Sequence, residues 1–237
     1  MNLAAIILAA GKGSRMRSST PKVLHKIAGL PLLGHVLNLT ESMRVNETRV
    51  VVGYESGQIE DYLKNRGSDA VCVRQARQLG TGDAVKCTKE SLKDFDGHLM
   101  ILCGDVPFLN KRSVLEMSKK ISAGADLVIL GFESSEPKNY GRIIINNKNQ
   151  IEGVIEEKDA NLAQKELTLC NSGIYYGKKS IIFSLLEEVR SDNAQLEFYL
   201  TDIIKLGSQR GLKIELCECG SNETLGINCR ADLATGE

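Results

Sequence analysis

Positive charge gathers near the N-terminus, inside a glycine-rich segment that follows an apolar run. Residues 7–29 read ILAAGKGSRMRSSTPKVLHKIAG, and the first acidic residue of the chain is Glu41. The cations that precede Glu41 are Lys12, Arg15, Arg17, Lys22 and Lys26. Glycines after a strand can expose backbone N–H groups, and arginine and lysine add mobile positive charge that suits phosphate oxygens. We therefore expect a polyphosphate site in this loop; the alternative is a surface turn with solvated cations.

Two common nucleotide-binding patterns do not account for this loop. The dinucleotide fingerprint G-x-G-x-x-G fails because its third glycine position holds Met16. The P-loop pattern G-x-x-x-x-G-K-[ST] does not occur in the sequence. The loop is long, since it reaches Pro21 before apolar residues resume. Its length suits a triphosphate.

A carboxylate follows a second apolar run. In LMILCGDVPFL, residues 99–109, a hydrophobic strand ends at Gly104 and Asp105. Ligands of open α/β sheets bind beyond the carboxyl ends of the strands, where the glycine loop also lies. Beside a polyphosphate, a carboxylate suits Mg²⁺, which takes one or two protein oxygens together with phosphates and water. The alternative for Asp105 is a simple turn residue.

A third segment, RQARQLGTGDA at residues 74–84, could hold a base. The amide of Gln75 can pair with a base edge, and the glycines around Thr81 allow close backbone approach. Thr81 is expected to N-cap a helix, with Asp83 in its first turn. A plain glycine turn into a capped helix explains this segment equally well.

The elements that must position these residues alternate between strands and helices. Strands are expected at 4–10, 49–54, 70–73, 99–105, 126–132, 168–177 and 213–219, with a hairpin over 141–159. Helices are expected at 31–44, 57–66, 81–95, 110–123, 178–190 and 195–209. This alternation predicts a Rossmann-like, doubly wound α/β fold with a mixed sheet. We expect one domain over 1–237, with a nucleotide-binding part at 1–134 and 205–237 and a small inserted lobe at 135–204.

Composition excludes several function classes. The 30 Lys and Arg balance 30 Asp and Glu, and Trp is absent, so neither bulk nucleic-acid binding nor a stacking platform is expected. No apolar run approaches the ~20 residues that span a bilayer, so no membrane partner is expected. The seven cysteines are scattered and fit reduced core thiols in a cytoplasmic protein. The three histidines are expected to be packing or surface residues.

Several short motifs together carry a resemblance over nearly the whole chain. In order they are LAAGKGSRM, PKVLHKIAG, QLGTGDA, GDVP, YGRI, VIEEKDA, NSGIY, EFYLTDII and GINCR. This set resembles the N-terminal uridylyltransferase domain of the bacterial GlmU family. The resemblance implies the reaction of UTP with N-acetylglucosamine 1-phosphate to UDP-N-acetylglucosamine and pyrophosphate, a precursor step for cell wall and lipopolysaccharide, with Mg²⁺ as cofactor.

The resemblance also implies roles for individual residues. Arg15 and Lys22 would hold the phosphates, and Asp105 and Asn228 would bind Mg²⁺. The nucleotide would be lined by Leu8, Ala9, Ala10, Gly11, Gln75, Gly80 and Thr81. The inserted lobe at 135–204 would be the sugar-binding lobe, and the sugar would be bound by Gly141, Glu156, Asn171, Tyr199 and Thr201. Glu156 and Glu157 are expected on opposite faces of a strand, with Lys158 on the face of Glu156.

The sequence departs from the family at two places. Leu196 stands where the family usually has glycine, and Phe198 where tyrosine is common, beside the expected sugar contacts. The chain ends at Glu237, before the β-helix that binds acetyl-CoA and forms trimers in the family, so we expect no acetyltransferase activity and leave oligomeric state open. The rival interpretations are a nucleotidyltransferase for another sugar 1-phosphate and a non-catalytic sugar-nucleotide-binding protein.

Overall fold

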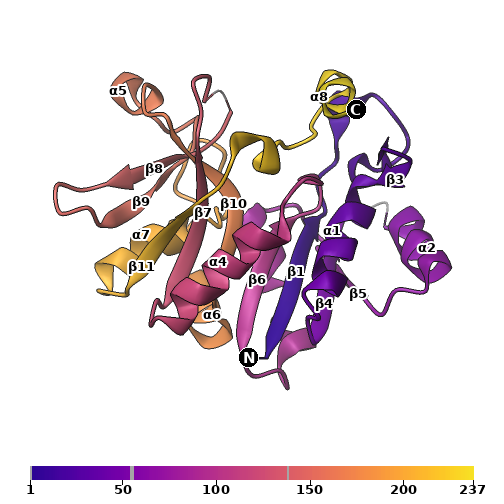
Figure 1. The fold of residues 1–237 in the computed structure, drawn as a ribbon, viewed down its shortest axis with the longest axis horizontal. Helices are drawn as coiled ribbons and strands as arrows, with labels where there is room; N and C mark the ends of the chain where they lie inside the picture. The colour runs from indigo at the N-terminus through magenta and orange to yellow at the C-terminus, as the bar shows by residue number, and fades with distance from the viewer. Residues whose placement is uncertain (1, 54–55, 138) are drawn as a thin grey trace.

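In the part of the chain that the structure describes, a nine-stranded sheet with helices on both faces forms the body of the protein (Figure 1). The structure, a computed structural model, describes residues 2–53, 56–137 and 139–237. Its strands are β1 (Leu3–Ala9), β2 (Lys26–Ile27), β3 (Leu30–Pro31), β4 (Glu47–Val52), β5 (Val71–Arg74), β6 (His98–Cys103), β7 (Leu127–Glu133), β8 (Arg142–Ile145), β9 (Ile151–Ile155), β10 (Leu169–Lys178) and β11 (Ile214–Glu218). Its α-helices are α1 (Leu32–Ser42), α2 (Gly57–Arg66), α3 (Thr81–Lys86), α4 (Lys111–Ser122), α5 (Leu162–Lys165), α6 (Lys179–Leu186), α7 (Asp202–Gln209) and α8 (Arg230–Gly236). Short 3₁₀ turns are η1 (Ser14–Met16), η2 (Lys22–Leu24), η3 (Glu90–Leu92) and η4 (Ser221–Thr224).

The sheet brings the ends of four parallel strands to one edge. Its order is β11-β7-β10-β6-β1-β4-β5, with β8 paired to β10 and β9 to β8. β6, β1, β4 and β5 run parallel, whereas β10 is antiparallel to both β6 and β7. Leu8 pairs with Cys103, and Ala9 with Val52, so these strands end level with one another. The predicted mixed, doubly wound sheet is confirmed, and the glycine loop, Gln75 and Asp105 all follow its carboxyl edge.

Alternating side chains of β1 build a core on each face of the sheet. Ala5 and Ile7 join one buried cluster with the apolar residues of α1, α2 and α4. Ala4 and Ile6 join the other, with those of α3, α6 and α7. Figure 1 shows α1 and α4 on the near face. A strand that is apolar on both faces is stable only with both faces covered, which is why the sequence LAAIILA takes a central position.

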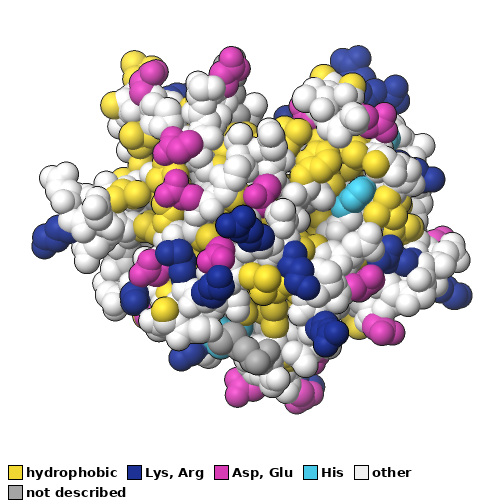
Figure 2. All heavy atoms as spheres, in the orientation of Figure 1, with side chains coloured by type: hydrophobic (Ala, Val, Ile, Leu, Met, Phe, Trp, Pro, Cys, Tyr) yellow, Lys and Arg dark blue, Asp and Glu magenta, His cyan; other side chains and the backbone are white. Residues whose placement is uncertain are grey.

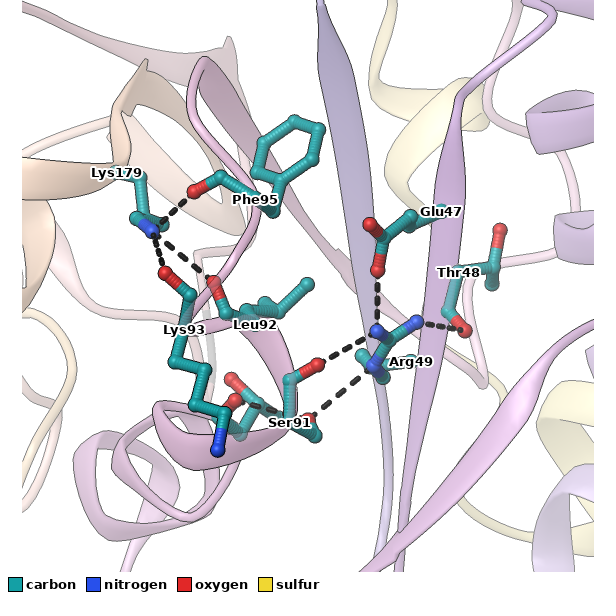
Figure 3. A network of polar contacts seen from close by, with 9 residues as sticks. Glu47, Thr48, Arg49, Ser91, Leu92, Lys93, Phe95 and Lys179 are labelled. Atoms are coloured by element: carbon teal, nitrogen blue, oxygen red, sulfur yellow. Dashed lines mark hydrogen bonds and ion pairs between the residues drawn. The ribbon is translucent and has the colours of Figure 1, made fainter.

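The predicted helix over 81–95 is too long. Helix α3 ends at Lys86, and the chain continues through turns and η3. The carbonyls there are bound by distant cations (Figure 3). Arg49 Nη2 donates to Ser91 O at 2.6 Å, and Lys179 Nζ donates to the carbonyls of Leu92 at 3.0 Å, Lys93 at 3.2 Å and Phe95. The last carbonyls of α3 itself accept from the backbone, in tighter turns such as Thr88 N to Val85 O at 3.0 Å and Lys89 N to Lys86 O at 3.1 Å.

The predicted helix over 195–209 begins only at Asp202, because the preceding backbone is bonded to another loop. Phe198 N donates to Leu79 O at 2.7 Å, and Gly82 N donates to Phe198 O at 2.7 Å. The hydroxyl of Thr81 accepts from Leu200 N at 3.0 Å. Thr81 is therefore not the N-cap of α3, a position that Gly80 occupies. This pairing fixes the loop at residues 79–82 against the segment at 197–200.

The strands β8 and β9 form the predicted hairpin. The hairpin joins the sheet through β10, which also lies between β6 and β7, so the 135–204 region shares a strand with the main sheet. The other predicted strands and helices lie within a few residues of the observed ones. Tyr54, at the end of the strand predicted over 49–54, lies outside the described residues.

Two negative findings concern membranes and disulfides. Among the helices that the structure describes, none is both long and apolar enough to cross a bilayer. All seven cysteines are free thiols. On the face drawn in Figure 2, basic and acidic side chains are interspersed, in line with the balanced net charge.

Candidate active site

The glycine loop leaves β1 at the carboxyl edge of the sheet and is anchored on its inner side. Met16, at the position of the missing third glycine, is fully buried, and Arg230 Nε donates to its carbonyl at 3.2 Å. Gly13 has φ +58°, and a Cβ there would lie 2.6 Å from Cβ of Lys22, so only glycine fits. A Cβ on Gly11 would meet nothing within 4 Å. The loop is therefore fixed on its inner side at Met16, and it is open at Gly11, where a ligand could approach.

Two oxygens from distant segments converge on the ammonium group of Lys22. Lys22 Nζ forms an ion pair with Asp105 Oδ2 and donates to Asn228 Oδ1 at 3.0 Å. Arg15 Nη2 donates to the same Asn228 oxygen at 3.2 Å. The side chains of Lys22 and Asp105 are only 15% and 18% exposed, so the charges are partly shielded from water. Four residues that the sequence assigned to phosphate and metal binding therefore meet at one point.

The orientation of Asn228 is set by its neighbours. Its Nδ2 donates to Gly226 O at 3.1 Å, which leaves Oδ1 directed at the cations. Asp232 Oδ2 accepts from the backbone N–H groups of Asn228 at 2.8 Å and Cys229 at 2.9 Å. Ile227 N donates to Asp105 O at 2.9 Å and holds this segment beside β6.

The chemistry of this donor pair fits a hard divalent cation. A carboxylate oxygen and an amide oxygen already share one cation, and Mg²⁺ prefers such oxygens, completing its shell with phosphates and water. Within the described ranges, no group of three or more His, Cys, Asp or Glu side chains is arranged to hold a metal ion. A metal held here would therefore depend on substrate oxygens as well as on Asp105 and Asn228.

A cavity of about 380 Å³ opens beside this cluster. The molecule is hollowed at the same edge of the sheet, between the part that carries α5 and the part that carries α8 (Figures 1 and 2). Every residue that the sequence assigned to the nucleotide lines the cavity, together with Lys22 and Asp105: Leu8, Ala9, Ala10, Gly11, Gln75, Gly80 and Thr81. The structure brings these seven residues together from two segments, 8–11 and 75–81, and places Lys22 and Asp105 beside them.

The MobA-like NTP transferase domain matches residues 5–165, which is more than half of the chain. The chain belongs to this family. The resemblance to GlmU proteins is also confirmed: the Bifunctional protein GlmU of Dinoroseobacter shibae is 41% identical over all 237 residues. The chain spans about half, 52%, of the length of that relative.

Two solved structures share the fold of this MobA-like chain at low sequence identity. A UDP-glucose pyrophosphorylase complexed with UDP-glucose has a TM-score of 0.81 at 17% identity, covering 100% of this chain and 97% of that one. The inositol-1-phosphate CTP transferase from T. maritima has a TM-score of 0.72 at 19% identity, covering 97% and 90%. These likenesses establish the fold alone, which carries nucleotidyltransferases that are named for different bases.

Four of the five residues assigned to the sugar lie in contact with one another. Asn171 N donates to Gly141 O at 2.8 Å, and Thr201 Oγ1 donates to Glu156 Oε1 at 3.0 Å. A Cβ on Gly141 would lie 3.4 Å from Glu156 Oε2. Burial raises the pKa of Glu156, and the carboxylates of Asp159, Asp202 and Glu197 add to this, while the Thr201 hydrogen bond opposes it. None of the five sugar residues lines the 380 Å³ cavity.

Tyr199 belongs to different surroundings. It is 6% exposed and, with Glu156, lines a second cavity of about 430 Å³ between α7 and the loop at residues 188–193. Burial raises the pKa of its phenol to about 12. Leu196 adopts φ +56°, the left-handed region that glycine occupies without strain, and its side chain is 76% exposed. This conformation suits the glycine that the resemblance led us to expect at position 196.

The residues after β9 differ from the expectation. The strand ends at Ile155, so Glu156 and Glu157 lie just beyond it, although they still point to different partners. Glu157 Oε2 lies 2.7 Å from Nη2 of the buried Arg142. Lys158 does not share the surroundings of Glu156, because it donates to Gln195 Oε1 instead.

Several side chains of the site were missed by sequence reasoning. Gln78 lines the nucleotide cavity and donates to Ala10 O, while Cys103 and Glu197 line the cavity as well. Gln78 lies inside the segment 74–84 that the sequence had already indicated. Its position three residues after Gln75 could have marked it as a second candidate for the nucleotide site. Asp232 supports Asn228 through the backbone, and no local pattern in the sequence distinguishes it from a helix-capping residue.

Proposed function

We propose that this chain transfers a uridylyl group from UTP to N-acetylglucosamine 1-phosphate, giving UDP-N-acetylglucosamine and pyrophosphate. The observation that carries the proposal is the convergence of Lys22, Asp105 and Asn228 beside a cavity lined by the glycine loop and Gln75. Matches to GlmU proteins over the whole chain support the choice of base and sugar.

The proposed chemistry is charge neutralisation and alignment. The phosphate of the sugar is ionised at neutral pH and attacks the α-phosphorus of UTP in line, while pyrophosphate leaves. Two polyanions must approach each other, so cations that hold them in place lower the barrier. Arg15 and Lys22 are the cations of the cluster and would hold the phosphates. The nucleophile is the substrate itself, so the reaction needs no histidine or cysteine base.

Family membership and the GlmU relatives support dependence on a divalent cation, and we propose Mg²⁺ as that ion. Asp105 and Asn228 would hold it, because their oxygens already face a shared cation. When bound, it would supply charge neutralisation at the phosphates. Asp232 and the backbone of Ile227 keep Asn228 in place.

For the sugar, we propose the cluster formed by Gly141, Glu156, Asn171 and Thr201. Glu156 and Thr201 offer a carboxylate and a hydroxyl for sugar hydroxyl groups. The amide of Asn171 is bonded to Tyr175 Oη at 2.9 Å and to Gly173 N at 3.0 Å, so its position is fixed before a ligand arrives. Tyr199 lines the same cavity as Glu156. We therefore propose that Tyr199 contributes to the sugar site by its position beside Glu156.

The test is pyrophosphate release from UTP and Mg²⁺ with three acceptors: N-acetylglucosamine 1-phosphate, glucosamine 1-phosphate and glucose 1-phosphate. Release confined to the N-acetylated sugar supports the whole proposal. Release with another sugar retains the uridylyl transfer and overturns the sugar assignment. If no combination of a nucleoside triphosphate and a sugar phosphate releases pyrophosphate, the interpretation as a binding protein is favoured. Equilibrium binding of UDP-N-acetylglucosamine would then test that interpretation.

A further inference from the structure

The amide of Gln75 is held in one orientation inside the nucleotide cavity. Gln75 is 4% exposed, and its backbone N–H donates to Val52 O at 2.9 Å, which places it directly after β5. Its Nε2 donates to two acceptors, Gly80 O at 3.0 Å and Asp83 Oδ2 at 2.7 Å. Both contacts lie on the same side of the amide.

These two contacts do not permit the amide to rotate by 180°. The rotated amide would place Oε1 against a backbone carbonyl and a carboxylate, neither of which can donate a hydrogen bond. In most crystal structures the oxygen and nitrogen of a side-chain amide look alike, so the orientation is assigned from the hydrogen-bond partners. Here both partners are acceptors, and one of them carries a full charge, so the choice is made by electrostatics.

The oxygen of the same amide is left for a ligand. Gln75 lines the 380 Å³ cavity, and no hydrogen bond found among the described residues reaches its Oε1. This oxygen is not among the fully enclosed polar atoms that lack a partner, so it is open to the cavity that Gln75 lines. The group that completes it must be a donor that enters the cavity.

A donor requirement discriminates between the two pyrimidines. Uracil carries an N3–H between its two carbonyl oxygens, whereas the same ring position of cytosine is an unprotonated acceptor. An amide that presents only its oxygen therefore binds the N3 edge of uracil and is repelled by N3 of cytosine. The shared fold does not make this choice, because it carries proteins named for both UDP-glucose and CTP.

We propose that Asp83 is a positioning residue for base selection: its carboxylate fixes Gln75 with the amide oxygen toward the cavity, and the site therefore accepts uracil and rejects cytosine. The inference rests on the proposed function for its nucleotide site, although it can be tested by binding alone. Asp83 lies in the first turn of α3, where the helix dipole favours its negative charge. An asparagine there could donate as well as accept, so it would remove the charged part of the restraint on Gln75 and leave only the Gly80 carbonyl to oppose rotation.

The experiment measures the dissociation constants of UTP and CTP by isothermal titration calorimetry, for the unaltered chain and for Asp83→Asn. We expect the unaltered chain to prefer UTP and the variant to lose about tenfold of that preference, equivalent to about 1.4 kcal/mol. The loss should combine weaker UTP binding with stronger CTP binding. Asp83→Glu, which keeps a carboxylate, should retain more of the preference than Asp83→Asn.

A double-variant cycle separates positioning from a general structural role. In a Gln75→Ala background, Asp83→Asn should leave the UTP to CTP ratio unchanged, since the amide through which it acts is gone. An equal loss in that background overturns the inference, as does an unaltered chain that binds both nucleotides alike. Absence of uridylyl transfer with the expected binding pattern overturns the proposed reaction and leaves the role of Asp83 standing.

Discussion

Replacing Lys22 with methionine should impair turnover strongly and yet improve binding of a divalent cation. Lys22 Nζ lies between the oxygens of Asp105 and Asn228, where it occupies the position that a metal ion would need. Methionine keeps most of the side-chain volume and removes the charge. The two effects have opposite signs, which makes the variant informative.

The size of each effect follows from the geometry. Loss of one donor to a transferring group typically costs 10²–10³ in kcat, or about 2.7–4 kcal/mol, and we expect a loss of this order. The ion pair is partly exposed, at 15% and 18% of its two side chains, so its removal is worth only about 1–2 kcal/mol. Freed from this competitor, the oxygen pair should bind a divalent cation about 5–30-fold more tightly.

The assay uses Mn²⁺ as a paramagnetic substitute for Mg²⁺. Electron paramagnetic resonance of free Mn²⁺ gives its dissociation constant, and pyrophosphate release gives kcat under saturating metal. Lys26→Met is the matched control, because it removes an equal charge from an exposed side chain four residues away. The melting temperature should fall by about 2–8 °C, since a loss of about 1–2 kcal/mol has that effect in a chain of this size.

Two results would refute this reasoning. A kcat within threefold of the unaltered enzyme would remove Lys22 from the catalytic machinery. Weaker Mn²⁺ binding by Lys22→Met would mean that the ammonium group helps to hold the oxygens in place instead of competing for them. The Lys26→Met control should change neither quantity.

Three further changes test the stability and pH dependence of the site. Glu156→Gln should raise the melting temperature at pH 8 but not at pH 4. Burial raises the pKa of the Glu156 carboxyl in the folded state, so this group destabilises the fold once it ionises and costs nothing below its unfolded pKa. A difference in melting temperature that does not depend on pH would contradict this. Gly80→Ala should lower the melting temperature by about 4–8 °C, since Gly80 has φ +115° and its Cβ would lie 2.6 Å from Phe198 O. Gly57→Ala, where a Cβ meets nothing within 4 Å, is its control and should be neutral. Arg49→Met should cost about 2 kcal/mol in urea unfolding, because it leaves the Ser91 carbonyl and Glu47 without their partner (Figure 3); an unchanged midpoint would show that water replaces the guanidinium.

The sequence alone was sufficient for the sheet and for half of the site. Runs such as LAAIILA are apolar at every position, and such strands must be covered on both faces. Parallel strands end at one edge of a sheet, so residues that follow different strands, Gln75 and Asp105, were expected near the glycine loop before any contact was known. Local patterns of this kind depend on neighbours in the chain, which the sequence displays directly.

Other features depended on contacts between distant residues. Arg49 and Lys179 bind carbonyls in the turns after helix α3, and residues 197–200 are not helical because they pair with the loop at 79–82. No periodicity in either segment reveals these partners.

The site itself was completed in the same way. Asn228 and Lys22 are 206 residues apart in the sequence and are hydrogen-bonded in the structure. The sequence places Asp83 only in the first turn of a helix, whereas the structure shows that it accepts a hydrogen bond from Gln75, because the loop between them folds back. The sequence determined which groups are available and at which edge of the sheet they emerge. The tertiary structure decided which oxygen, ammonium and amide face one another, because a hydrogen bond depends on positions within about 3 Å that only the packed chain fixes.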